Sequence, residues 1–92
     1  MYNFNVSIII PCLNESKNLT KLIPEIKSCI GKRFSFEILI IDGMNVDKKT
    51  KLITKKYKVK YFNRINNNDY GNAVRLGIIK SSGKYIIFMD GD

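Results

Sequence analysis

The residues best placed to do chemistry in this chain are carboxylates, because the 92 residues include no histidine. The tripeptide at 90–92 places two of them, Asp90 and Asp92, on either side of Gly91 and directly after an apolar segment. In an extended backbone both side chains would share one side, which suits joint binding of a divalent cation and a ligand hydroxyl. Taken alone, the tripeptide is explained better by a turn, since Asp and Gly are common turn residues.

Two further acidic residues also lie shortly after apolar segments of the chain. Asp42 also follows an apolar segment, where its carboxylate would accept hydrogen bonds from a base N–H or a ribose hydroxyl, or cap the next helix. Glu15 stands at a predicted helix start, where a negative charge is favourable with or without a ligand. Each residue has a structural explanation by itself. The order of the three acidic positions along the chain is what indicates a ligand site.

The acidic residues must be positioned by four short segments rich in Ile, Val, Phe and Tyr. These segments lie at 6–10, 36–41, 59–62 and 85–89. The first, second and fourth are almost continuously apolar, which is typical of strands buried on both faces of a parallel sheet.

Segments with helical periodicity lie between the predicted strands. The first has one apolar face, formed by Leu19, Leu22, Ile23, Ile26 and Ile30. Asn14 or Ser16 is its predicted cap and Gly31 its predicted stop. Pro24 lies inside this stretch and is expected to kink or split the helix.

The second and third helices are predicted over about 47–56 and 70–82. The second has a thinner apolar face in Leu52, Ile53 and Tyr57, and the third carries Ala73, Val74, Gly77 and Ile78. Strand and helix alternating in this way predict one α/β domain with a parallel sheet and right-handed crossovers. Ligands bind at the carboxyl ends of such strands, so the acidic residues should converge there. The polar loop at 63–69 is predicted to be the least structured stretch.

Composition narrows the class of protein. Hydrophobic residues make up 45% of the chain and charged residues 26%, as in globular domains, and no apolar run is long enough for a bilayer. No secretory signal opens the chain, so we expect a cytoplasmic protein. Two cysteines are too few for a disulfide scaffold, and without histidine a zinc site or a His-based triad is not expected.

The formal net charge of +8 favours an anionic partner, whether nucleotide phosphates, nucleic acid or an acidic membrane surface. Much of this charge comes from seven lysines between positions 48 and 60. A solvated helix face explains this cluster better than a membrane contact. Nucleic acid binding is less favoured, because no recognised motif accompanies the charge.

Four segments together resemble the amino-terminal half of family 2 glycosyltransferases. They are Ser-Ile-Ile-Ile-Pro-Cys-Leu-Asn-Glu at 7–15, Glu-Ile-Leu-Ile-Ile-Asp-Gly at 37–43 with Asp47, Tyr-Gly-Asn-Ala-Val-Arg-Leu-Gly-Ile at 70–78, and Ser-Gly-Lys-Tyr-Ile-Ile-Phe-Met-Asp-Gly-Asp at 82–92. The stretch at 70–73 is similar to the polyprenyl-phosphate sugar synthases. The segments at 11–15 and 42–44 are similar to exopolysaccharide transferases.

The resemblance implies a Rossmann-like, GT-A-type fold that binds a nucleoside-diphosphate sugar. In such a fold the Asp42 position holds the base, and Pro11 and Glu15 line the nucleotide pocket. Asp90 binds the ribose, and Asp90 and Asp92 bind Mg²⁺ or Mn²⁺ on the diphosphate. The implied activity is sugar transfer to a polyprenyl-phosphate or polysaccharide acceptor, on or near the cytosolic membrane face.

Two departures from the family pattern matter. Gly43 stands where many members have a second acid, so base recognition must rest on Asp42 or be weaker. The chain also ends at Asp92, after its fourth strand, whereas the resemblance places the general base, the acceptor pocket and any membrane-associating segments further on. We therefore expect residues 1–92 to be the amino-terminal donor-binding part of a catalytic domain, inactive alone.

The alternative is a truncated, non-catalytic nucleotide-binding or interaction module. A basic surface-binding protein without a nucleotide site is a third possibility, but it leaves the order of the acidic residues unexplained.

A sheet that ends at its fourth strand would expose Ile86, Ile87 and Phe88, and repulsion among the positive charges opposes compaction of the chain. The expected consequence is a marginally stable or self-associating chain.

Overall fold

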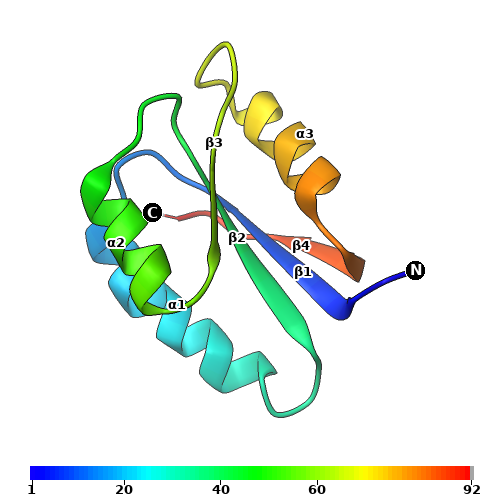
Figure 1. Cartoon of the computed structure of the whole chain (residues 1–92). Coiled ribbons are helices and arrows are strands. Elements are labelled where there is room, and N and C mark those ends of the chain that lie inside the picture. Colours follow the sequence, from blue (N-terminus) through cyan, green and yellow to red (C-terminus); the bar gives the residue numbers. More distant parts are fainter. Residues whose placement is uncertain (92) are drawn as a thin grey trace.

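A computed structural model describes residues 1–91, in which strands and helices alternate as predicted (Figure 1). The elements are β1 (Phe4–Pro11), α1 (Ser16–Ile30), β2 (Phe36–Asp42), α2 (Lys48–Lys56), β3 (Lys60–Asn63), α3 (Tyr70–Lys80) and β4 (Gly83–Phe88). Within these residues the strands form one parallel sheet in the order β3-β2-β1-β4. The predicted parallel α/β fold is therefore confirmed.

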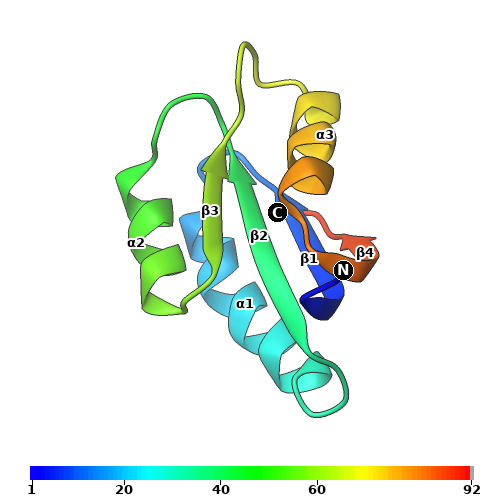
Figure 2. The ribbon, with the colours of Figure 1, turned by 45° about the vertical axis from the view of Figure 1, so that its right-hand side comes forward.

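The helices cover both faces of the sheet (Figure 2). α1 and α2 pack on the face that carries Ile8, Ile10, Ile38 and Ile40, whereas α3 packs on the face of Ile9, Leu39 and Ile41. All these strand side chains are almost fully buried. β1 and β2 are thus buried on both sides, which explains their continuous apolar runs.

α1 differs from its prediction at its start and at its proline. Its N-cap is Glu15, not Asn14 or Ser16, and no side chain caps it. Pro24 lies inside the helix without splitting it. Pro24 and Thr20 are both exposed, so water can satisfy the Thr20 carbonyl that lacks its helical donor. Gly31 follows the last helical residue, as predicted.

The prediction for the buried face of α2 is confirmed only in part, because Ile53 and Tyr57 pack against the core whereas Leu52 does not. Thr50 and Thr54 are its buried residues, while Leu52 points outward with 65% of its surface exposed. The threonine hydroxyls can be buried because both are satisfied: that of Thr50 donates to Asp47, the N-cap, and that of Thr54 donates to the Lys51 carbonyl.

α3 lies very close to the sheet through its small residues. Ala73 and Gly77 are buried, and a Cβ added to Gly77 would lie 2.5 Å from Cγ2 of Ile9. The predicted apolar face extended to Ile78, which is instead half exposed. Only a glycine permits this close approach of the helix to β1.

β4 forms an edge of the sheet with little cover on either face. Tyr85, Ile86, Ile87 and Phe88 are all exposed, so the predicted exposure of 86–88 is confirmed. The burial of this strand on both faces, which its apolar run suggested, is wrong for residues 1–91. Self-association through this edge stays a prediction.

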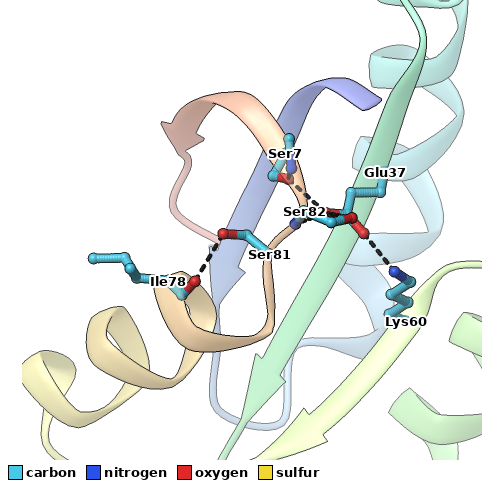
Figure 3. Close-up of polar contacts among 7 residues, drawn as sticks. Ser7, Glu37, Lys60, Ile78, Ser81 and Ser82 are labelled. Carbon is cyan, nitrogen blue, oxygen red and sulfur yellow. Dashed lines mark hydrogen bonds and ion pairs between the residues drawn. The ribbon is translucent and has the colours of Figure 1, made fainter. Parts of the chain in front are cut away.

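A polar cluster fastens the strands at the amino edge of the sheet (Figure 3). The Glu37 carboxylate of β2 accepts hydrogen bonds from the Ser7 hydroxyl of β1, from Lys60 of β3, and from the amide and hydroxyl of Ser82 just before β4. Ser7 in turn accepts a hydrogen bond from the amide of Gly83. One buried carboxylate therefore connects segments of all four strands.

Candidate functional site at the carboxyl edge of the sheet

A cavity of about 390 Å³ opens at the carboxyl ends of β1 and β4. It is lined by Pro11, Cys12, Leu13, Glu15, Arg64, Asn68, Tyr70 and Asp90. These residues come from the end of β1, the loop before α1, the loop after β3, the first turn of α3 and the segment after β4. The volume lies in the range of small-molecule sites, and the edge is where parallel sheets bind ligands.

Three of the residues expected to bind a nucleotide line this cavity together: Pro11, Glu15 and Asp90. The segment after β4 is held against β1, because the Met89 amide donates to the Ile9 carbonyl at 3.0 Å. Gly91 continues this close approach, since a Cβ there would lie 2.7 Å from Cβ of Cys12. Asp92, the second predicted metal ligand, lies outside the described residues.

Asp42 ends β2 beside the cavity but does not line it. Only 1% of its surface is exposed, and its carboxylate accepts hydrogen bonds from the Tyr61 hydroxyl at 2.9 Å, the Asn14 amide at 3.4 Å and the Cys12 thiol at 3.8 Å. All three donors are neutral, and two of the contacts are long. Because the carboxylate is almost fully buried, a ligand group can reach it only by displacing one of these neighbours.

The buried surroundings of Asp42 also affect its neighbours. Burial, followed by the negative charge of Asp42, raises the pKa of the Cys12 thiol to about 12. Burial is the largest cause that raises the pKa of Tyr61, and its hydrogen bond to Asp42 adds to the increase. At neutral pH both groups are therefore protonated donors, and Cys12 is not a nucleophile.

Arg64 is the main residue of this site that the sequence analysis missed. It is only 6% exposed, and its guanidinium donates to the carbonyls of Asn68 at 2.8 Å, Cys12 at 3.1 Å and Ile41 at 3.4 Å. Its Nε is buried without a hydrogen-bond partner among the described residues. The sequence signal for it is its place just beyond the predicted strand at 59–62, at the same edge as Asp42 and Asp90.

The loop after β3 contains no helix or strand, in agreement with the prediction, but its side chains form hydrogen bonds to the segment after β2. The Asn68 side chain accepts a hydrogen bond from the Met44 amide at 2.7 Å, and the Asn63 side chain donates to the Gly43 carbonyl at 2.7 Å. A Cβ on Gly43 would lie 2.6 Å from Cδ2 of Leu13. A second acid after Asp42 would therefore require the exposed Leu13 side chain to move.

The carboxylates of this edge suit a hard divalent cation in type but do not enclose one. Within residues 1–91 no three side chains of the metal-ligating kinds gather. Mg²⁺ typically binds one or two carboxylates together with substrate phosphates and water, and not a cage made only of protein. The exposed Asp90 carboxylate at the cavity fits that kind of shared coordination.

The fold is that of an α/β protein with a parallel sheet, and the cavity lies at the carboxyl edge, where such proteins bind their ligands. The family model described as glycosyl transferase family 2 matches residues 7–92. The chain therefore belongs to glycosyl transferase family 2, as its motifs indicated.

Relatives and solved structures support this assignment. The chain is 31% identical to the human dolichyl-phosphate beta-glucosyltransferase, covering 95% of this chain and 31% of that protein. It is 32% identical to the dolichol-phosphate mannosyltransferase of Pyrococcus furiosus, covering 95% of this chain and 25% of the relative. The chain thus spans about a third or less of the length of these relatives.

The fold resembles that of glucosyl-3-phosphoglycerate synthase from Mycobacterium tuberculosis, solved with Mn²⁺, UDP and phosphoglyceric acid. The TM-score is 0.79 at 20% identity, over 98% of this chain and 34% of the other. This likeness confirms the predicted GT-A-type fold. No helix among residues 1–91 has the length and apolar character needed to cross a bilayer.

Proposed function

We propose that the protein containing this chain transfers a sugar from a nucleoside-diphosphate sugar to a polyprenyl-phosphate or polysaccharide acceptor. Residues 1–92 are its amino-terminal donor-binding part. The observation that carries the proposal is the carboxyl-edge cavity, where Pro11, Glu15 and Asp90 meet inside the span matched by the family. The names of the two curated relatives favour a polyprenyl-phosphate acceptor over a polysaccharide.

The charged residues that line the cavity are one guanidinium, Arg64, and two carboxylates, Glu15 and Asp90, so a diphosphate ligand would need a cation as well as Arg64. Arg64 carries a positive charge that no carboxylate pairs with among the described residues, and three carbonyl dipoles only partly compensate it. An anionic ligand in the cavity would be attracted by this guanidinium, and the interaction is strengthened by the low-dielectric surroundings.

Asp90 and Asp92 would hold Mg²⁺ or Mn²⁺ beside the same diphosphate. When bound, the cation supplies positive charge to the nucleoside diphosphate as the bond to the sugar carbon breaks. Asp42 is assigned to the base, since its carboxylate is held by neutral donors that a base N–H can replace.

The two acceptors differ in what they demand of the enzyme. A phosphate monoester is largely ionised near neutral pH, so its oxygen can attack the sugar carbon without a general base. A polysaccharide hydroxyl must lose its proton during the transfer and therefore needs a base. We assign no such base among residues 1–92.

Calorimetry of the chain with UDP and GDP tests the donor site. We expect binding with Mg²⁺ or Mn²⁺, and affinity weaker by about tenfold or more when a chelator is present or in Asp90→Asn, which is ~1.4 kcal/mol or more. Asp42→Ala should lose binding and the control Lys55→Ala should keep it. Equal binding with the chelator would remove the metal role, and loss in Lys55→Ala but not in Asp42→Ala would remove the site assignment.

Transfer of a radiolabelled sugar separates the enzyme from the non-catalytic module. We expect the whole protein to label a polyprenyl phosphate, and residues 1–92 alone to bind nucleotide without transferring sugar. A whole protein that binds nucleotide but labels no acceptor would favour the binding module. Transfer by the isolated chain would show that residues 1–92 suffice for activity.

A further inference from the structure

The outward face of α2 combines a protruding apolar side chain with a ring of lysines. Lys48, Lys51 and Lys55 line a shallow groove with Leu52, at the i, i+3, i+4 and i+7 spacing of one helical stripe. Leu52 also lines a second groove, between α1 and α2, together with Lys17 and Lys49. We call these six residues, Lys17, Lys48, Lys49, Lys51, Leu52 and Lys55, the basic helix face.

The positive charges of this face are not neutralised within the described part of the chain. The single ion pair among residues 1–91 joins Lys60 to Glu37, which lies at the amino edge of the sheet. Asp47 and Glu15 line a pocket with Lys17 and Lys49 but form no ion pair with them, and two carboxylates leave an excess of positive charge beside five lysines. The five lysines are therefore available to an external anion.

Packing explains why Leu52 points away from the protein. α2 turns Thr50, Ile53, Thr54 and Tyr57 toward the sheet and α1, which leaves Leu52 on the opposite side with 65% of its surface exposed. Buried threonines and an outward leucine reverse the usual distribution on a surface helix. The reversal places the one large apolar group of the outer stripe at the centre of its lysines.

We propose that the basic helix face docks the protein on an anionic lipid bilayer. Leu52 enters the boundary between headgroups and acyl chains, while the surrounding ammonium groups meet lipid phosphates and the lysine stems lie along the surface. A nucleic acid is less well matched, because this face offers neither arginine forks nor aromatic rings for stacking. This inference does not depend on the proposed function.

The position of α2 gives the docking a consequence for the site. α2 begins at Lys48, six residues after the end of β2, and so at the carboxyl edge that also bears the cavity. A docked chain would therefore hold the cavity close to the lipid surface. A lipid-linked phosphate acceptor would be presented at that surface.

Cosedimentation of the chain with vesicles tests the proposal. The vesicles consist of phosphatidylcholine alone or of phosphatidylcholine mixed with phosphatidylglycerol. We expect binding only to the anionic vesicles, weakening as salt is raised. Replacing Lys48, Lys51 and Lys55 together by Gln should weaken binding by about 100-fold, at roughly fivefold per lysine. Leu52→Asn should weaken it by about tenfold and leave most of the salt dependence.

The matched control replaces Lys32, Lys80 and Lys84 by Gln, which removes the same charge from exposed positions off the basic helix face. Its vesicle affinity should fall by less than about threefold. Equal weakening in the two triple variants, or no binding to anionic vesicles at low salt, would overturn the proposal. So would an unchanged affinity in Leu52→Asn, or tighter binding to a DNA duplex than to anionic vesicles. Nucleotide binding should be unaffected in all these variants, which keeps this test separate from that of the donor site.

Discussion

The two ends of β2 each bury a carboxylate, and the two are held in different ways. Glu37, near the amino edge, is bonded by the Lys60 ammonium and by three donors from Ser7 and Ser82. Asp42, at the carboxyl edge, has only neutral donors, from Tyr61, Asn14 and Cys12. Charge-assisted, fully satisfied bonds stabilise a fold, whereas weakly held ones leave an acceptor that a ligand can use.

Burial acts to raise the pKa of Glu37, but the hydrogen bonds from Lys60, Ser7 and Ser82 outweigh it and hold this pKa below its ordinary value. The ionised form is thus the one that the amino edge stabilises. A buried carboxylate at the end of a strand is therefore not by itself a sign of function. The hydrogen-bond donors around the carboxylate determine its role, and at the amino edge they make Glu37 a structural residue.

The largest effect on stability is expected from Glu37→Ala. The change leaves the buried Ser7 hydroxyl and the partly buried Ser82 amide without their acceptor, so we expect the free energy of unfolding to fall by about 3 kcal/mol. Urea unfolding measures this. Glu25→Ala, on the exposed side of α1, is the control and should change stability by less than about 0.5 kcal/mol. Similar losses in both variants would contradict a fastening role for Glu37.

Arg64→Met should produce the next largest change, about 2 kcal/mol. It keeps an apolar stem but leaves the carbonyls of Cys12, Ile41 and Asn68 without their donor. Nucleotide affinity should fall as well, because the cavity loses its buried positive charge. Arg64→Lys should recover part of both losses.

Arg75→Met is the matched control for Arg64, since Arg75 is exposed on α3. It should leave stability within about 0.5 kcal/mol and nucleotide affinity unchanged. If stability falls in Arg64→Met while nucleotide affinity stays at the wild-type value, the guanidinium is only a structural clamp.

Lowering the pH is expected to reduce the free energy of unfolding by a smaller amount. Because folding lowers the pKa of Glu37, the folded state binds fewer protons than the unfolded state as that group titrates. The stability that Glu37 contributes is therefore present above the unfolded pKa of about 4.3 and is lost as the pH falls through the folded value. Urea unfolding between about pH 6 and pH 3 should show a steeper loss for the wild type than for Glu37→Gln. Parallel curves would contradict this linkage.

The smallest change in stability is expected from Asp42→Asn. The amide keeps an acceptor for Asn14 and Cys12 and removes a buried charge that only neutral donors hold, but the Tyr61 hydroxyl loses its acceptor, so stability should fall by about 1 kcal/mol. Nucleotide affinity should fall by about tenfold or more in the same variant. A loss of stability as large as that of Glu37→Ala would make Asp42 a second structural carboxylate and end the contrast between the two edges.

Much of the carboxyl edge could be predicted because parallel strands end together. The apolar runs that end at Pro11 and Asp42 predicted where the chain turns, and Pro11, Glu15 and Asp90 do line one cavity. The position of Arg64 after the third strand could be predicted in the same way, but its hydrogen-bond partners could not. Its three carbonyl partners come from three segments, and one of them, Cys12, lies 52 residues away in sequence.

The sequence by itself determined the strand order along the chain, the parallel sheet and the edge at which the acids meet, since these follow from local apolar patterns and from the geometry of the α/β unit. Tertiary structure alone decided which side chains are paired, buried or exposed. It buried Asp42 among neutral donors, paired Glu37 with Lys60 and turned Leu52 outward beside Lys51. The physical reason is that hydrogen-bond partners and helix orientation depend on contacts between distant segments, which no local pattern records.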